Sequence, residues 1–213
     1  MDKNLEFVTS QRVKRTMEAL EKNNMEAHLV NNKVELIDKI KDICKEGEVV
    51  SVGGSMTLFE TGVIDFLRSG KYEFLDRYKE GLTPEEIKDV FRKSFFADSY
   101  FTSSNAITEN GWLYNVDGNG NRVAAMLYGP DKVIVIVGVN KIVKDLDKAI
   151  ERNKEISAPA NCLRLNRSTP CSKVGYCLDC NSKDRICNEY TLIKRQREKG
   201  RITVIFLKEN FGY

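Results

Sequence analysis

The sequence predicts an α/β protein in which strands and helices alternate along a single domain, residues 1–213. Stretches with apolar residues at helical spacing alternate with stretches at strand spacing, which is typical of strands joined by helices. Residues 133–137 are all Val or Ile, as in a strand whose two faces are both covered. A chain of 213 residues without an internal repeat or a low-complexity segment suits one hydrophobic core.

Four helices are predicted from apolar residues that recur every three or four positions. The clearest start is the capping box at Thr83–Glu86, which has proline at the first helical position. The longest helix is expected after residue 142, where Leu146, Ala149 and Ile150 share one face. The predicted helices are an N-terminal helix through 13–20, followed by 34–44, 84–95 and 143–157.

The predicted strands are bounded by polar and turn-forming residues. They are 25–30, 48–52, 99–103, an extended pair around 111–116, 133–137 and 202–207. The only histidine, His28, falls in the first strand, where a partly exposed residue without a chemical role is the usual outcome. Because a strand returns after the cysteine-rich segment at about 160–188, we interpret that segment as a loop inserted in the domain.

Composition argues against two classes of partner. Lys and Arg exceed Asp and Glu by only 34 to 31 and are spread along the chain, so no nucleic-acid-binding surface is predicted. The longest apolar run, 133–139, is far shorter than the ~20 residues of a membrane-spanning helix. The first residues have no apolar segment behind a basic start, as a secretory signal would have, so we expect a cytoplasmic protein.

Four of the six cysteines, Cys171, Cys177, Cys180 and Cys187, follow one another in the pattern Cys-x5-Cys-x2-Cys-x6-Cys. Four thiolates this close in sequence can surround one metal centre, and a Cys-x2-Cys turn presents two sulfurs on one side. Two disulfides and four unused thiols are the alternatives. Stable disulfides are rare in the cytosol, and the polar, turn-forming neighbours do not favour burial as small apolar side chains. The segment therefore predicts a metal centre.

Spacing bears on which metal centre is expected. Structural zinc usually has two tight pairs of ligands about a dozen or more residues apart, whereas this chain has one tight pair with a looser arm on each side. An all-thiolate set suits an iron–sulfur cluster of the 4Fe–4S type at least as well, and zinc remains the alternative. Cys162, nine residues before Cys171, is available as a spare or alternative ligand, whereas Cys44 is expected on the buried face of the helix at 34–44.

A second candidate site is predicted where polar residues follow strands. Gly53 and Gly54 allow a tight turn after the strand at 48–52, and Ser55 and Thr57 add hydroxyl groups where a helical stretch begins. Backbone N–H groups at a helix start favour an anion, and a plain strand-to-helix turn is the alternative. The segment has neither the Gly-Lys-Ser/Thr of a Walker loop nor the full spacing of a dinucleotide-binding loop.

Polar residues also follow the strands at 99–103 and 133–137, and ligands of open α/β sheets bind at such strand ends. Arg122 is available to meet an anion beside the turn at 117–121; calcium is excluded there because Arg122 and Tyr128 replace the required glycine and glutamate. Lys141, just beyond a strand end, is expected to contribute little to the core. The predicted site for a small anionic metabolite comprises Gly53, Gly54, Ser55, Thr57, Ser103, Ser104, Asn105, Arg122 and Lys141.

Six segments together resemble the LUD-domain, or lactate-utilisation, family over nearly the whole chain: VGGSMTLFETGV, TSSNAITENG, NVDGNGNRVAA, VIVGVNKIV, the helix ending AIERNKEISAPAN, and TPCSKVGYCLDCNSKDRICN. The resemblance implies an open, largely parallel sheet flanked by helices, similar to the fold of the sugar-phosphate isomerase, deaminase and CoA-transferase group. It also implies a link to systems that oxidise lactate to pyruvate through iron–sulfur proteins, which would be partners of this chain. It transfers no catalytic residue.

The Glu109–Gly111 tripeptide matches the Glu-Asn-Gly of CoA transferases, whose glutamate forms a thioester. In those enzymes the motif lies at a different place in the fold, so we interpret Glu109 as a turn residue.

Two functions therefore remain open. In the first, the protein serves a lactate-oxidising system, binds a small anionic metabolite and carries an iron–sulfur centre. In the second, it is an isomerase-like or CoA-transferase-like enzyme acting on a phosphorylated or carboxylated small molecule, with a structural zinc in the cysteine loop. With a single histidine in the chain, hydrolysis by a Ser-His-Asp or Cys-His set is disfavoured.

Overall fold

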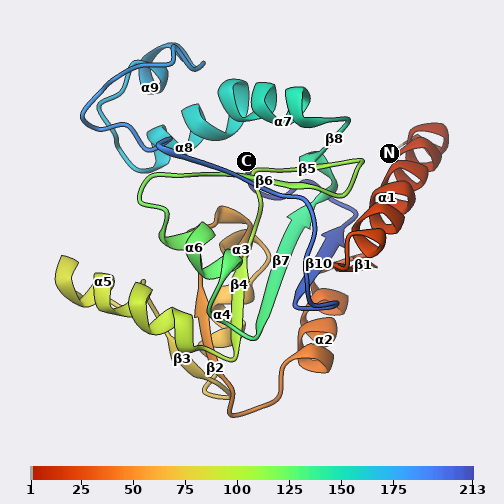
Figure 1. Ribbon diagram of the computed structural model, residues 1–213, viewed down its shortest axis with the longest axis horizontal. Coiled ribbons are helices and arrows are strands. Elements are labelled where there is room, and N and C mark those ends of the chain that lie inside the picture. Colours follow the sequence, from red (N-terminus) through yellow and green to blue (C-terminus); the bar gives the residue numbers. More distant parts are fainter. Residues whose placement is uncertain (1) are drawn as a thin grey trace.

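A six-stranded parallel sheet forms the centre of the computed structural model, which describes residues 2–213 (Figure 1). Its strand order is β1-β10-β7-β4-β2-β3. The strands are β1 Glu26–Val30, β2 Val49–Val52, β3 Glu73–Leu75, β4 Ser99–Thr102, β7 Lys132–Gly138 and β10 Ile202–Leu207. The predicted α/β fold, with an open, largely parallel sheet flanked by helices, is confirmed.

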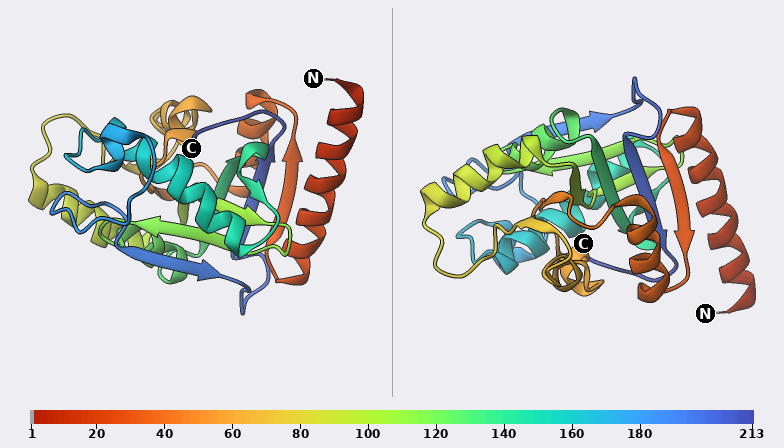
Figure 2. Two further views of the ribbon diagram at one scale, coloured as in Figure 1. Left: turned by 90° about the horizontal axis from the view of Figure 1, so that it is seen from above. Right: turned by 90° about the horizontal axis from the view of Figure 1, so that it is seen from below.

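Helices cover both faces of this sheet because its strands carry apolar side chains on both sides (Figure 2). In β7 the valines Val133, Val135 and Val137 pack on one side, and Ile134 and Ile136 pack on the other, as alternation along a strand requires. The valine side is covered by α1 (Lys3–Lys22) and α6 (Asn121–Leu127), and the isoleucine side by α2 (Lys33–Ile43), α3 (Met56–Glu60) and α4 (Val63–Leu67).

The predicted capping box is present at the start of α5 (Pro84–Lys93). The Thr83 hydroxyl accepts a hydrogen bond from the Glu86 N–H at 3.2 Å, and the Glu86 carboxylate accepts one from the Thr83 N–H at 2.8 Å. The helix ends two residues earlier than predicted, and a 3-10 turn continues over Ser94–Phe96. None of the residues of α5 is buried, so the start of the helix is fixed mainly by the hydrogen bonds of the capping box.

A second, four-stranded sheet was not predicted beyond the extended pair at 111–116. Its order is β8-β5-β6-β9, and β6 pairs antiparallel with both of its neighbours. The strands are β5 Ala106–Thr108, β6 Leu113–Asp117, β8 Ile142–Val143 and β9 Glu189–Ile193. Ile107, Leu113 and Ile193 pack into the same core as the valine side of β7, so this sheet covers part of the main sheet.

The predicted helix at 143–157 is wrong at both ends. Val143 belongs to β8, and Asp145 caps the helix by accepting a hydrogen bond from the Lys148 N–H at 3.0 Å. The helical path then runs as α7 (Leu146–Arg152), a π-helical turn (Asn153–Ser157) and α8 (Ala158–Arg164). The wider π turn shifts the apolar register, and Ile156 is left 47% exposed.

The cysteine-rich segment begins inside α8, contains the short helix α9 (Cys171–Val174) and leads into β9 (Figure 1). β9 pairs with β6, so the segment is tied to the second sheet at its end. A membrane-spanning helix, long and apolar enough for a bilayer, is not found within residues 2–213.

Candidate functional site

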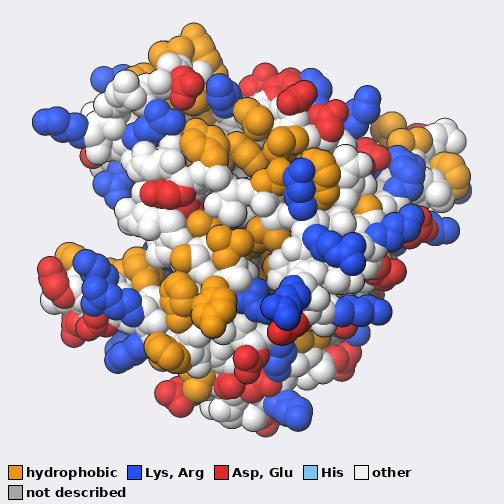
Figure 3. Space-filling view, viewed as in Figure 1, with side chains coloured by type: hydrophobic (Ala, Val, Ile, Leu, Met, Phe, Trp, Pro, Cys, Tyr) orange, Lys and Arg blue, Asp and Glu red, His pale blue; other side chains and the backbone are white. Residues whose placement is uncertain are grey.

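The segments that follow β2, β4 and β7 meet at one edge of the main sheet. β4 lies between β2 and β7, and the three strands run parallel, so their carboxyl ends are adjacent. A cavity of about 480 Å³ lies there, and its lining includes Gly54, Ser103 and Lys141, one residue from each segment. Figure 3 shows the surface hollowed between the cysteine-rich segment and α5. Ligands of open α/β sheets bind at such edges.

The floor of this cavity concentrates the buried charge of the molecule. Among residues 2–213 four charged side chains are buried, and they are Asp117, Arg122, Lys141 and Arg152. Asp117, Arg122 and Lys141 line the cavity, and Arg152 donates a hydrogen bond to the carbonyl of Asn105, which also lines it. Because three cations face one anion, the floor is electropositive. This is unusual, since buried charges are normally balanced by a partner.

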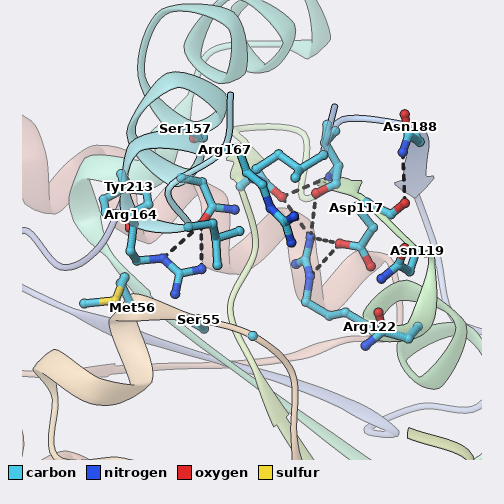
Figure 4. A pocket seen from close by; sticks show the side chains of 18 of the residues that line it. Ser55, Met56, Asp117, Asn119, Arg122, Ser157, Arg164, Arg167, Asn188 and Tyr213 are labelled. Atoms are coloured by element: carbon cyan, nitrogen blue, oxygen red, sulfur yellow. Dashed lines mark hydrogen bonds and ion pairs between the residues drawn. The ribbon is translucent and has the colours of Figure 1, made fainter. Parts of the chain in front are cut away.

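Arg122 has all of its donors engaged by the protein. Its Nε donates to Asp117 at 2.8 Å, and its Nη1 donates to the Ser103 carbonyl at 2.8 Å and to Asn115 at 2.7 Å. Its Nη2 donates to Asn105 at 2.9 Å and to a backbone carbonyl of β6. A guanidinium group has five N–H donors, so none is left for a ligand. Arg122 therefore holds the loop after β4 against β6 and adds charge to the floor (Figure 4).

Lys141 has few partners for a buried cation. Its Nζ donates to the hydroxyls of Thr57 at 3.0 Å and Ser103 at 3.1 Å, and it forms no ion pair within residues 2–213. Burial lowers its pKa to about 7, and the positive charges of Arg152 and Arg122 act in the same direction. The expectation that Lys141 contributes little to the core is wrong, because the residue is only 3% exposed.

Arg152 stands where α7 passes into the π-helical turn. It donates to the carbonyls of Asn140 at 3.2 Å and Asn105 at 2.7 Å, and to the Ser157 hydroxyl at 2.8 Å. Burial without a carboxylate partner lowers its pKa to about 10, so it remains a cation at neutral pH. The π turn brings Ser157 to the cavity wall, and such turns are frequent at functional sites.

The structure brings the nine predicted ligand-binding residues together, although they have different roles. Seven of them line the cavity: Gly54, Ser55, Ser103, Ser104, Asn105, Arg122 and Lys141. Gly53 and Thr57 lie behind the wall. A Cβ atom at Gly53 would come within 2.9 Å of the Arg122 side chain, so glycine is needed there for close packing.

The helix that follows the glycines does not supply the predicted anion-binding terminus. α3 has only five residues, and Ser55 forms no side-chain capping bond. The dipole of so short a helix is small, so the charge that favours an anion comes from the side chains of the floor.

The mouth of the cavity carries cations that the sequence did not indicate. Four such cations line the cavity, and within the part of the chain that the structure describes none of them forms an ion pair with a carboxylate. They are Arg77, Arg164, Arg167 and Lys183. Arg77 stacks on Phe91 with 4.4 Å between the guanidinium carbon and the ring centroid. Arg164 from α8 donates to Asn161, on the opposite side of the cavity from Arg122 (Figure 4). Exposed lysines and arginines in loops are common, so nothing in the sequence singled these out.

The cysteine loop is organised by one arginine. Arg185 donates to the carbonyl of Cys180 at 2.6 Å and to that of Cys187 at 2.8 Å. The Cys177 sulfur accepts a hydrogen bond from the Asp179 N–H at 3.3 Å, a contact that suits a thiolate in a Cys-x2-Cys turn. Cys171 and Cys187 are buried, whereas Cys177 and Cys180 are half-buried. Among residues 2–213, no three Cys, His, Asp or Glu side chains are arranged to hold a metal ion, and the predicted metal centre stays a prediction.

Cys162 lies close to the cysteine loop. Burial raises its pKa to about 11, and the side chains of Thr169, Cys171 and Cys187 act on it as neighbours. The Thr169 hydroxyl also lies 3.3 Å from the Cys171 sulfur. Cys162 is therefore near enough to the predicted ligands to remain a spare or alternative ligand. Cys44, in contrast, is buried against Ser99 and packs in the core on the isoleucine side of the main sheet.

Glu109 lies outside the cavity lining, and its carboxylate is paired with two arginines. Its carboxylate accepts hydrogen bonds from Arg12 at 2.9 Å and from Arg15 at 3.0 Å. Both arginines belong to α1, so these ion pairs hold that helix against the second sheet. This arrangement agrees with the interpretation of Glu109 as a turn residue.

Comparison with known proteins identifies the family of this chain. The model of the LUD domain matches residues 13–207, and the chain belongs to that family. A search of curated proteins found no matching sequence. The structure is similar to a DUF162-family protein from Deinococcus radiodurans, with 14% identity, a TM-score of 0.55, and coverage of 93% of this chain and 97% of that chain. At that identity the similarity concerns the fold.

Two further structures are similar to about half of the chain. eIF2B beta from Chaetomium thermophilum has 15% identity and a TM-score of 0.36, with coverage of 54% of this chain and 44% of that chain. A ribose 5-phosphate isomerase from Plasmodium falciparum has 15% identity and a TM-score of 0.32, with coverage of 53% and 52%.

Proposed function

We propose that this LUD-domain protein binds a small anionic metabolite in the cavity at the carboxyl edge of its main sheet. The observation that carries the proposal is the imbalance of buried charge on the cavity floor. Lys141, Arg122 and Arg152 face one acid, Asp117, and an anion would complete the balance. The volume of about 480 Å³ lies within the usual range of small-molecule sites.

Family membership supports a role associated with lactate utilisation. Lactate and pyruvate are small carboxylates, and a carboxylate can accept a hydrogen bond from the third N–H of Lys141, whose other two go to Thr57 and Ser103. The partners we propose are iron–sulfur proteins of a lactate-oxidising complex.

A thermal-shift screen followed by calorimetry tests the ligand. Lactate, pyruvate, ribose 5-phosphate and CoA are the probes, and at least one should raise the midpoint of unfolding. Lys141→Met should weaken binding of that probe by about 1–3 kcal/mol, as expected for a lost charged hydrogen bond. Lys144→Met, an exposed lysine three residues further on, is the matched control and should bind normally. If no probe changes the midpoint, the proposed function is wrong.

We also propose that the cysteine loop holds an iron–sulfur centre, with Cys171, Cys177, Cys180 and Cys187 as ligands. The donor set fits in its chemistry, because all four are thiols, the Asp179 N–H donates to the Cys177 sulfur, and the positive charge of Arg185 favours a negative sulfur at Cys187. A bound cluster would supply one-electron transfer. Zinc on the same thiols is the alternative.

Anaerobic purification with metal and sulfide analysis tests the centre. A 4Fe–4S cluster predicts about four irons and four sulfides per chain. Finding one zinc per chain would contradict the iron–sulfur cluster but support the four cysteines as a metal site. Disulfides among these cysteines in freshly lysed, thiol-trapped cells would contradict both.

A further inference from the structure

Lys141 is a buried amine that the fold leaves incompletely paired. The two hydrogen bonds from its Nζ go to neutral hydroxyls, those of Thr57 and Ser103. The acid whose charge acts on Lys141 is Glu60, and its carboxylate already accepts a hydrogen bond from the Gly212 N–H at 2.6 Å. A lysine that served only to stabilise the fold would be expected to have a buried carboxylate beside it.

The surroundings of Lys141 favour its neutral form. Burial lowers its pKa to about 7, Arg152 and Arg122 add to this effect, and Glu60 opposes it. Near neutral pH a large share of the Lys141 side chains therefore carries a free electron pair on Nζ. For an ordinary lysine that share is roughly one in a thousand or less. Desolvation and nearby cations are the usual means of activating a lysine as a nucleophile.

The rest of the cavity suits a ligand that carries both negative charge and a polar carbonyl group. Lys141 lines the cavity, and its Nζ lies 3.1 Å from the hydroxyl of Ser103, which also lines it and can pass a proton to or from a reacting oxygen. Arg152 and Arg122 keep the floor positive, while Arg164 and Arg167 stand at the mouth. An anionic group would be attracted to these cations, and a carbonyl carbon beside it would meet the amine.

We propose that Lys141 is a nucleophile that forms an imine with a small anionic carbonyl compound bound in the cavity. This inference rests on the proposed anion-binding function. The Nζ electron pair attacks the carbonyl carbon, Nζ gives up one proton, the carbonyl oxygen takes one up, and a carbinolamine results. The hydroxyl then takes up a second proton and leaves as water as the carbon–oxygen bond breaks, and Nζ gives up its remaining proton, so that a carbon–nitrogen double bond remains. No electron is gained or lost overall, so no oxidant or reductant is needed.

Two kinds of ligand share this chemistry, namely 2-oxo acids and phosphorylated aldehydes or ketones. Pyruvate and ribose 5-phosphate distinguish them as probes. Each is incubated with the protein at pH 7 in the presence of sodium cyanoborohydride, which reduces an imine to a stable secondary amine. Peptide mass spectrometry then locates the adduct. Lactate, which has the carboxylate but no carbonyl, is the control that adds no mass.

The proposal predicts an adduct on Lys141 from one of the two probes. Lys141 should be modified at least about ten times more than the exposed Lys144, because a larger share of its amine is neutral and the ligand is held beside it. The Lys141→Arg variant keeps the charge but cannot form an imine, and it should lose this adduct. Mapping the adduct in the unmodified protein does not depend on how that variant folds.

Three outcomes would overturn the proposal. In one, Lys141 is modified no more than Lys144. In another, the adduct persists at other lysines when Lys141 is Arg. In the third, pyruvate or ribose 5-phosphate raises the unfolding midpoint but leaves no adduct; anion binding would then stand without the nucleophile. If neither stabilisation nor an adduct is found with any probe, the proposed function fails as well.

Discussion

The cavity floor and the cysteine loop are both polar, but they are held in place in different ways. On the floor, Arg122, Lys141 and Arg152 are buried, and each donates at least two hydrogen bonds. In the loop, Cys177 and Cys180 are half-buried, and much of the order comes from Arg185. The floor is thus held by the hydrogen bonds of several buried side chains, whereas the loop depends largely on one arginine, and the proposed metal centre would add a second source of order to it.

The two regions also touch. The loop contributes Lys183, Asp184 and Arg185 to the lining of the cavity. A change in how the cysteines are held would therefore move side chains at the cavity mouth and leave the floor in place.

Breaking the ion pair of the floor should have the largest effect. In Asp117→Asn the guanidinium of Arg122 loses its one carboxylate, which lies 2.6 Å away. Loss of one partner of a buried pair predicts a fall of about 3–5 kcal/mol in the free energy of unfolding. Asp89→Asn removes an exposed pair with Arg92 and should cost under about 1 kcal/mol. Urea denaturation measures both. Equal losses would mean that the floor is no better organised than the surface.

Lys141 should make stability depend on pH in an unusual direction. Its folded-state pKa of about 7 lies below its ordinary value, so between those values the unfolded chain binds a proton that the folded chain does not. Raising the pH from 7 toward 10 should therefore stabilise the protein, by up to about 1.4 kcal/mol per pH unit. The comparison is with Lys141→Met, which lacks this contribution. Parallel pH profiles of the two proteins would contradict the depressed pKa.

Removing one cysteine should separate the loop from the floor. Cys180→Ser should sharply lower the bound metal of anaerobically prepared protein, because a four-thiolate centre loses a ligand. Its effect on metabolite affinity should be smaller, at most about 1 kcal/mol, since only the mouth of the cavity is disturbed. Cys44→Ser, in the core, should leave the metal bound. Undiminished metal in the Cys180→Ser protein would remove Cys180 from the proposed ligands.

Charge at the mouth should matter least. Arg167 is exposed and has no carboxylate partner among residues 2–213. Arg167→Ala should weaken binding of an anionic probe by under about 1 kcal/mol, and added salt should reduce the difference. Arg197→Ala, an exposed arginine outside the cavity lining, is the control and should have no effect. A loss that persists at high salt would indicate a direct, desolvated contact instead.

Much of the main sheet was predictable because its strands carry strong local signals. The final strand at 202–207 was predicted with the bounds it has, and the capping box located the start of α5. The grouping of the loops after β2, β4 and β7 followed from a general rule for parallel sheets. The second sheet was missed because its strands have two to five residues and depend on pairing with distant segments.

The site was predictable in position but not in its chemistry. Lys141 has the sequence context of a surface lysine, and its burial results from the packing of Thr57, Ser103 and Gly212 around its amine. The engagement of all five N–H groups of Arg122 depends on β6 and the loop after β4, which are brought together only by the fold. Nothing in the sequence singles out Arg152, because a cation inside a helix is ordinarily exposed.

The central claim is that an unpaired, buried lysine on the cavity floor awaits an anion, and NMR titration of the Lys141 side chain tests it most directly. Selective isotope labelling, with Lys141→Met to assign the signal, gives the pKa of its amine with and without pyruvate or ribose 5-phosphate. We predict a pKa of about 7 in the free protein, and a higher value for the fraction that holds an anion without forming an adduct. A pKa near 10.4, unchanged by either probe, is the value of a solvated lysine and would contradict the account.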